Sequence, residues 1–286
     1  TPKGRAIAAA VRGLRGPLTE LWLRAEPEWD PVAIHYSQPS IQVDWLLEST
    51  VDGRTWPRRF SSYEATHNRQ AALRVQWLSA LRAAGWSPRF LAAPEIEAGA
   101  LRDGPWLALL MPGSWAMSER EVRAVREFAR AGGMLIYNGE PAAWDERGRL
   151  REEPIFEPQP DDGPSDYLER LSRRVPRSVW IESTAPVALF RRRLGDVRLI
   201  GITLETGATM GEDLRIADRP VQSPAEVELR FAQTVWAVDL RSGQRHPRAD
   251  RIRLRLDPTE PPMLAVSAAP FPPAGNVVED LLARGR

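Results

Sequence analysis

The sequence predicts an α/β protein: a flavodoxin-like, doubly wound parallel sheet followed by a small antiparallel β-sandwich. Up to residue 150, short apolar strands alternate with helical segments in the order β-α-β-α-β-α-β, joined by tight links. From Val179 onward the helical periodicity is lost, and short β-type runs separated by turn signals take its place. At 286 residues the chain is long enough for two domains with cores of their own.

The stretch from Trp106 to Leu150 holds the clearest βαβ step. Leu107–Met111 is a short apolar run that ends at a Pro-Gly pair, as expected of a strand buried on both faces. Ser118 and Glu121 have the spacing of a capping box, which predicts the start of a helix. A glycine pair ends this helix before the next predicted strand.

The elements before this step are predicted in the same way. Val32–Tyr36 is an apolar strand, and residues 37–62 after it are interpreted as a long irregular segment. Apolar residues at helical spacing predict a helix over Tyr63–Ala84, which a glycine stops. A strand over Arg89–Ala92 and a short helical turn over Ile96–Leu101 complete the α/β half.

The sequence indicates five parts. Residues 1–28 are expected to form a connector helix from an upstream domain, because the chain begins at a threonine with helical pieces. Residues 29–150 form the α/β domain, and the acidic, proline-rich stretch 151–178 is a linker with a short helix. The β-sandwich is expected over residues 179–270 and a tail over residues 271–286.

Composition argues against several classes of function. With 39 basic and 38 acidic side chains the net charge is +1, so no bulk field attracts nucleic acid or an anionic membrane. The arginine-rich runs Arg191–Arg193 and Arg251–Arg255 are interpreted as solvated strand faces. The absence of cysteine excludes disulfides, thiolate metal sites and a cysteine nucleophile. No cofactor is expected, and the sequence does not specify a cellular compartment.

The chain has no complete catalytic motif, and no catalytic residue is predicted. Ser114 stands at a strand-to-helix turn but lacks the second glycine of a nucleophile elbow, so it is interpreted as part of a βα loop. His35 is interpreted as a packed or surface residue. The three histidines (His35, His67 and His246) are too few and too scattered for a metal site.

One segment has the chemistry of a binding site. Thr55–Glu64 connects the first strand to the first long helix, at the sheet edge where open α/β folds bind ligands. Its aromatic faces and charged groups suit sugar rings and carboxylates. The alternative is that its aromatic residues only cover the sheet edge while its polar residues cap the helix. The candidates for a substrate rim or a subunit interface are Trp56, Arg59, Tyr63, Glu64 and His67.

Three stretches carry a family resemblance: VAIHYSQPS (Val32–Ser40), RRFSSYEATHNRQ (Arg58–Gln70) and MPGSWAMSEREVRAVREFARAGGMLIYNGEPAAWDERGR (Met111–Arg149). They are similar to the C-terminal part of family-42 β-galactosidases. The resemblance is clearest over residues 1–150 and continues more weakly through WAVDLRSGQ into the sandwich. It implies that the α/β domain is a trimerisation domain with a class I glutamine amidotransferase-like fold.

The resemblance implies a role in architecture. In this family the two catalytic glutamates lie on an N-terminal (β/α)₈ barrel, which this sequence does not contain. The implied function is the non-catalytic C-terminal region of a glycoside hydrolase, inactive alone, which forms a homo-oligomer such as a trimer and borders the active site. Carbohydrate is then bound through the upstream barrel. Two alternatives remain open: a stand-alone carbohydrate-binding or scaffolding protein, and a serine-dependent hydrolase.

Overall fold

The computed structural model describes residues 15–52, 69–160, 164–204, 223–257, 260–273 and 275–284, together with residues 4, 8 and 11. Contacts divide the described chain into two compact units. One contains residues 29–177, and the other contains residues 15–28, 178–204 and 223–284. In the described part of the chain no helix is both long and apolar enough to cross a bilayer.

The first unit is built on a four-stranded parallel sheet with the order β3-β2-β4-β5. Strand β2 is central, because Ile34 pairs with Phe90 of β3 on one side and with Leu110 of β4 on the other. The winding therefore reverses between β2 and β4, so the sheet is doubly wound as predicted. The strands are β2 (Val32–Tyr36), β3 (Arg89–Ala92), β4 (Ala108–Met111) and β5 (Met134–Tyr137).

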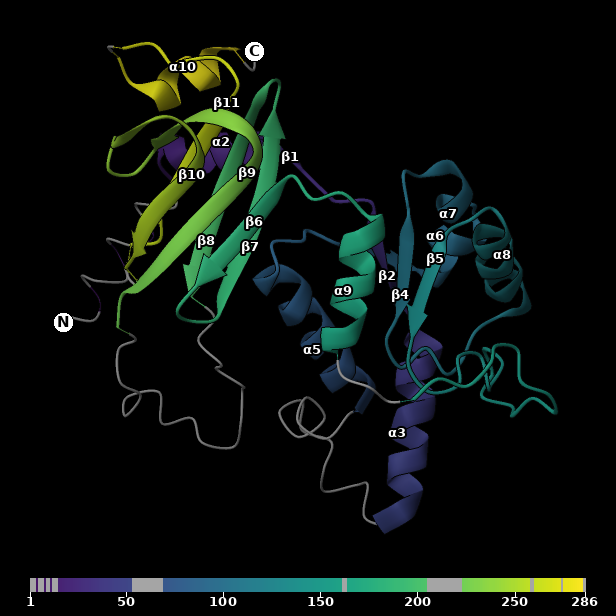
Figure 1. Ribbon diagram of the computed structural model, residues 1–286. Helices are drawn as coiled ribbons and strands as arrows, with labels where there is room; N and C mark the ends of the chain where they lie inside the picture. Colours follow the sequence, from purple (N-terminus) through teal and green to yellow (C-terminus); the bar gives the residue numbers. More distant parts are fainter. Residues whose placement is uncertain are drawn as a thin grey trace. The chain divides into compact units, whose positions relative to one another are not determined.

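Helices cover both faces of this sheet, because side chains of successive strand residues point to opposite faces. On one face Ala33, Leu109 and Met111 pack against α6 (Ala93–Glu97), α7 (Ala100–Asp103) and α8 (Glu119–Arg130). On the other face Val32, Ile34 and Leu110 pack against α5 (Arg69–Ala83) and α9 (Pro164–Arg174). Figure 1 shows α8 and α9 on either side of the sheet.

The predicted βαβ step is confirmed. Ser118 caps α8, accepting a hydrogen bond from the backbone N–H of Glu121, while the Glu121 side chain reaches back to the N–H of Ser118. Gly132 has a φ of 96°, a left-handed conformation that ends the helix. The helix predicted from residue 63 is α5 over its described residues, and Trp77 and Leu81 are buried as its periodicity predicts.

The irregular segment predicted after β2 is wrong for residues 38–52, which form helix α3 (Gln38–Asp52). The physical reason is a start signal in the sequence. The Ser37 hydroxyl accepts a 3.1 Å hydrogen bond from the N–H of Ser40, and Pro39 occupies the first turn, where a proline lacks no needed donor.

The stretch 151–178, predicted as a linker with a short helix, contributes α9 to the α/β core. Tyr167 stacks on Trp77 of α5 with ring centroids 5.0 Å apart, and Leu171 is buried beside them. Residues 164–174 therefore belong to the same compact unit as the sheet.

The second unit is a seven-stranded antiparallel sheet with the order β1-β7-β8-β11-β9-β10, in which β6 also pairs with β9. Every neighbouring pair is antiparallel. The strands are β1 (Glu26–Pro27), β6 (Val179–Ser183), β7 (Val187–Leu194), β8 (Val197–Leu204), β9 (Ala225–Asp239), β10 (Arg245–Leu256) and β11 (Met263–Ser267).

The sequence predicts two packed sheets, but the structure has one connected antiparallel sheet, because the long strand β9 links β6 to β11. The first half of β9 pairs with β6 and its second half with β11, while β10 follows β9 through two register shifts. VELRF and TVWAVDL are two of the short β-type runs of the sequence, and both belong to β9 because neither glycine nor proline separates them. One core still unites both parts, with Val227 from the first half of β9 and Ala237 from the second.

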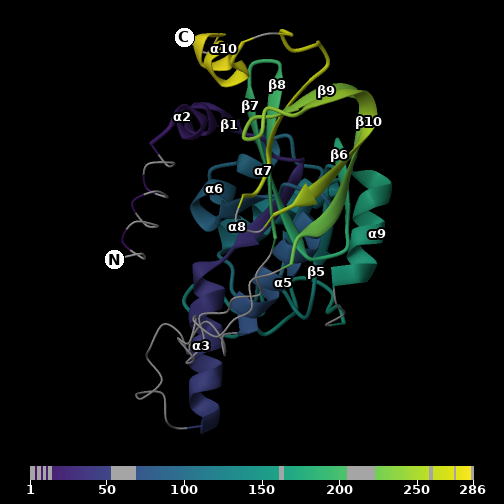
Figure 2. The same cartoon turned by 90° about the vertical axis from the view of Figure 1, so that its left-hand side faces the viewer.

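Two helices at the ends of the chain pack on the antiparallel unit. In α2 (Pro17–Arg24) Leu21 is fully buried, and in α10 (Val277–Arg284) Leu281 is nearly so. The two helices lie side by side, as Figures 1 and 2 show. From the sequence we expect a connector over residues 1–28 and a tail over residues 271–286. The described residues of both segments contribute to a core that also includes Leu199 and Ala265.

The interpretation of the arginine runs as solvated strand faces is right for Arg251–Arg255 and wrong for Arg191 in the other run. Arg251, Arg253 and Arg255 are exposed, as expected of a solvated strand face. Arg191 is instead 3% exposed and donates a 2.7 Å hydrogen bond to the hydroxyl of Ser178. A charged side chain is buried here because a polar partner lies within reach.

Candidate functional site

The carboxyl edge of the parallel sheet gathers buried polar side chains from distant parts of the sequence. His35 lies near the end of β2, Ser114 follows β4, and Asn138 follows β5. Strands β2 and β4 are paired neighbours, and the winding reverses between them. Open α/β sheets bind ligands at this point, so this edge is the first candidate for a functional site.

His35 is hydrogen-bonded on both sides of its ring. Its Nδ1 lies 2.8 Å from Oγ of Ser114, and its Nε2 lies 3.0 Å from Oε1 of Glu121. An ionised carboxylate only accepts hydrogen bonds, so a neutral imidazole carries its proton on Nε2 and accepts the Ser114 proton at Nδ1. A hydroxyl, an imidazole and a carboxylate in this order are the components of an activated serine nucleophile.

Burial separates this Ser114–His35–Glu121 constellation from any substrate. The exposed fraction is 0% for the His35 side chain and 1% for that of Glu121, and Ser114 is fully buried. A nucleophile must approach the reacting carbon to about 3 Å, which this burial prevents. The constellation instead ties β2, the loop after β4 and helix α8 together. Ser114 is thus a loop residue, as predicted. His35 is expected to be either packed or on the surface, and it is packed.

Glu121 has its second carboxylate oxygen satisfied by the helix start. Oε2 accepts a 2.7 Å hydrogen bond from the N–H of Ser118, while the hydroxyl of Ser118 donates to Oε1 of Glu97 at 2.5 Å. Sequence reasoning found the capping role of Glu121 but missed its bond to His35. The available signal was a serine just after a central strand, combined with a histidine near the end of another strand.

Small polar residues close the rest of this edge. Ser37 donates a 2.8 Å hydrogen bond to the carbonyl of Ala116, and the N–H of Ala116 donates to the hydroxyl of Ser40 at 2.9 Å. The N–H of Gly113 donates to Oδ1 of Asn138 at 3.0 Å. The loop after β4 is therefore fixed to the start of α3 and to the residue after β5.

The predicted site residues Trp56, Arg59, Tyr63, Glu64 and His67 lie outside the described residues. The description resumes at α5, where the N–H of Gln70 donates a 3.0 Å hydrogen bond to Oδ2 of Asp44. Burial raises the pKa of Asp44, and the hydrogen bond from Gln70 opposes that shift. The guanidinium of Arg69 lies 5.5 Å from the ring centre of Trp115, so α5 begins next to the loop after β4.

Among the described residues no group of three or more His, Asp or Glu side chains is arranged to hold a metal ion. His35 is bound to Ser114 and Glu121, and His246 lies on β10 of the other unit. Burial lowers the pKa of His246.

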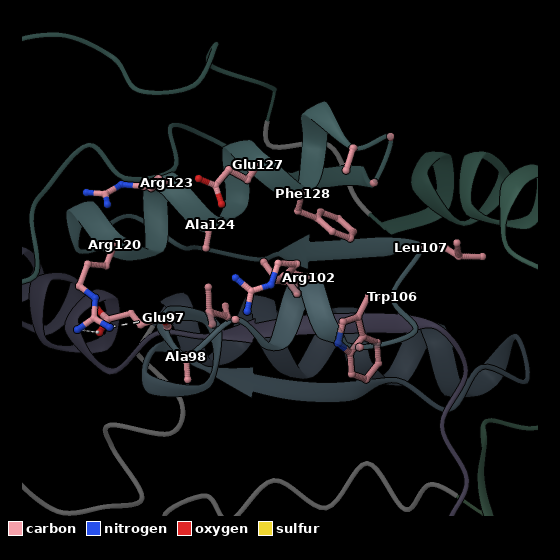
Figure 3. A pocket seen from close by; sticks show the side chains of 17 residues that line it. Glu97, Ala98, Arg102, Trp106, Leu107, Arg120, Arg123, Ala124, Glu127 and Phe128 are labelled. Carbon is pink, nitrogen blue, oxygen red and sulfur yellow. Dashed lines mark hydrogen bonds and ion pairs between the residues drawn. The ribbon is translucent and has the colours of Figure 1, made fainter.

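A separate groove of about 550 Å³ lies on the first unit, between α6 and α7 on one side and α8 on the other. Figure 3 shows Ala124, Glu127 and Phe128 of α8 facing Arg102 of α7 and Trp106, which follows it. This groove was not predicted from the sequence, because it forms between helices whose relative positions depend on how they pack on the sheet.

The chain is similar in fold to part of the family-42 β-galactosidases, as the sequence resemblance predicts. The β-galactosidase of Bacillus circulans sp. alkalophilus matches 84% of this chain with a TM-score of 0.52 at 9% identity, over 42% of its own length. Gan42B, a GH42 β-galactosidase from G. stearothermophilus, matches 83% with a TM-score of 0.51 at 11% identity, over 40% of its length.

These identities show the fold alone, and the chain spans only about two fifths of either enzyme. No protein-family model and no curated protein sequence matches the chain.

Proposed function

We propose that this chain is the non-catalytic C-terminal region of a glycoside hydrolase of the β-galactosidase type, with its catalytic groups on an upstream barrel. The observation that carries the proposal is the fold match: 84% of the chain is matched by less than half of a β-galactosidase. Burial at the carboxyl edge of the parallel sheet supports the proposal, because Ser114 and His35, which resemble a serine nucleophile and its base, are both buried.

Within this proposal the first unit has a flavodoxin-like, class I amidotransferase-like fold and serves in assembly. Numbered within its own sheet, the strand order is 2-1-3-4, which agrees with the first four strands of the flavodoxin arrangement. A chain without cysteine lacks the nucleophile that amidotransferase chemistry needs, which favours a structural role for this fold.

The proposed assembly is a homo-oligomer, with a trimer as the expected state, and Trp56, Arg59, Tyr63, Glu64 and His67 as rim or interface residues. Light scattering on the purified chain tests it. The expected mass is a multiple of the 32.1 kDa subunit, and Trp56→Ala or Arg59→Ala reduces it if these residues form the contact. A mass of one subunit at micromolar concentration contradicts the assembly role.

A second candidate is a stand-alone carbohydrate-binding or scaffolding protein. The segment Thr55–Glu64 favours it, because its aromatic and charged side chains suit sugar rings and carboxylates. Calorimetric titration with galactosides distinguishes the two: submillimolar binding that Trp56→Ala or Arg59→Ala abolishes supports the second candidate.

A further inference from the structure

Arg74 of α5 lies over the end of the central strand β2 without an acidic partner. Its guanidinium carbon is 4.9 Å from the ring centre of Tyr36, the last residue of β2, and its Nη1 donates a 3.1 Å hydrogen bond to Oε1 of Gln70. Among the described residues no carboxylate forms an ion pair with Arg74. Burial lowers the pKa of Arg74, and the neighbouring Tyr36 opposes that shift. A half-buried cation without a counter-charge is costly, so an anion bound here would stabilise the fold.

The side-chain amide of Gln70 has a donor left over. Gln70 is 0% exposed, and its Nε2 has no hydrogen-bond partner within the described structure. The bond from Arg74 fixes how this amide is turned, because a guanidinium only donates and the amide oxygen must therefore face it. Since nearly all buried polar atoms in folded proteins have partners, the unpaired Nε2 indicates an acceptor that the chain itself does not supply.

Gln70 and Arg74 lie at the carboxyl edge of the parallel sheet, beside its two central strands. Tyr36 ends β2, and Gly113 comes shortly after the end of β4. A Cβ atom at position 113 would lie 3.1 Å from Cγ of Gln70, so α5 approaches the loop after β4 closely at this point. The winding of the sheet reverses between β2 and β4, which is where open α/β sheets bind their ligands.

The polar atoms that remain select a ligand that accepts hydrogen bonds. The side-chain oxygen of Gln70 is used by Arg74, and that of Gln38 accepts a 3.3 Å hydrogen bond from the hydroxyl of Tyr36. The groups left over are the other N–H donors of the guanidinium and the amide N–H donors of the two glutamines. A cation would be repelled by Arg74. A carboxylate suits the set, because it only accepts hydrogen bonds and its two oxygens match the fork of a guanidinium.

We infer that this edge of the sheet binds a small carboxylate between Arg74 and Gln70, beside the ring of Tyr36. Arg74 supplies the charge and its remaining N–H donors, and Nε2 of Gln70 supplies a further donor to one carboxylate oxygen. Nε2 is closed to solvent, whereas Arg74 and Tyr36 are part-exposed, so the ligand enters over these two side chains and a side-chain shift gives it access to Nε2. The site goes beyond the proposed function, because it needs neither the assembly nor an upstream barrel.

Proton–nitrogen NMR spectra of the full chain test the site, with sodium acetate and its neutral counterpart acetamide as probes and sodium chloride keeping the ionic strength constant. Acetate should shift the side-chain amide signal of Gln70 and the backbone N–H signal of Gly113, with a dissociation constant on the order of 1 mM, and acetamide should bind far more weakly. Arg74→Met removes the charge, and Gln70→Glu sets a carboxylate of the chain against Arg74. Each weakens acetate binding, read at Gly113, by about tenfold or more. Arg130→Met, at an exposed arginine of α8, leaves it unchanged.

Three results overturn the inference: acetate shifts neither signal, acetamide binds as tightly as acetate, or binding survives either Arg74→Met or Gln70→Glu. Because Arg74 is only part-buried, its variant keeps the test valid should Gln70→Glu fail to fold. The test reads neither the mass of the oligomer nor galactosidase activity, so failure of the site is distinguishable from failure of the proposed function.

Discussion

Nε2 of His35 lies 3.0 Å from Oε1 of Glu121, and both side chains are buried. This bond joins the central strand of the parallel sheet to the first turn of α8, across 86 positions of sequence. Because Glu121 also accepts from the backbone of Ser118, one carboxylate both caps the helix and anchors it to the sheet. This bonding explains why the Ser114–His35–Glu121 constellation, which resembles that of a serine hydrolase, has a structural role.

Glu121→Ala is expected to lower the free energy of unfolding by about 3 kcal/mol, because it leaves the buried Nε2 of His35 and the part-buried N–H of Ser118 without an acceptor. Urea titration followed by circular dichroism measures it. Glu127→Ala, on the exposed face of the same helix, serves as the control and should change stability by less than about 0.5 kcal/mol. Equal effects of the two substitutions would contradict the role given to Glu121.

Ser114 is expected not to react with a fluorophosphonate probe, because its hydroxyl is buried and bonded to His35. Mass spectrometry of the intact chain after prolonged incubation detects any adduct. A stoichiometric adduct that Ser114→Ala abolishes would revive the serine hydrolase alternative.

Gly133→Ala should cost about 1–3 kcal/mol of stability, because the new methyl group meets the ring of Phe128. The double substitution Gly133→Ala/Phe128→Leu removes part of that ring and should recover some of the loss relative to Phe128→Leu alone. A double-mutant cycle by thermal unfolding measures the coupling. Strictly additive losses would show that the two positions do not meet.

The free energy of unfolding should fall in acid because the Glu28 carboxylate becomes protonated. Burial alone would raise the pKa of its carboxyl, but hydrogen bonds from Arg198 and Arg193 and the charges of Arg198 and Arg191 outweigh it and lower the pKa below 4.5. A carboxyl whose pKa is lowered by folding stabilises the fold above its unfolded pKa, and loses this contribution as the pH falls through the folded value. The difference in unfolding free energy between the native chain and Glu28→Gln should therefore shrink below pH 4.5. A constant difference from neutral pH into that range contradicts it.

The sequence predicts the elements whose signals are local. Strand β4, the capped helix α8 and the glycine stop at Gly132 follow from neighbouring residues. Helix α3 is not predicted from the sequence, although Ser37 and Pro39 mark its start.

Features that depend on distant pairing could not be predicted. The bond between His35 and Glu121 requires β2 and β4 to be neighbours, and β9 pairs with β6, β10 and β11 along different parts of its length. Burial of Arg191 depends on where Ser178 lies. The site predicted at Trp56–Glu64 stays a prediction, because it lies outside the described residues.

The most direct test of the account is the rate at which the purified chain hydrolyses an aryl β-galactoside. The account predicts a rate no higher than that of the buffer, because the proposed function assigns the catalytic groups to an upstream barrel. Steady turnover that disappears when one acidic residue of the chain is exchanged for its amide would contradict the central claim.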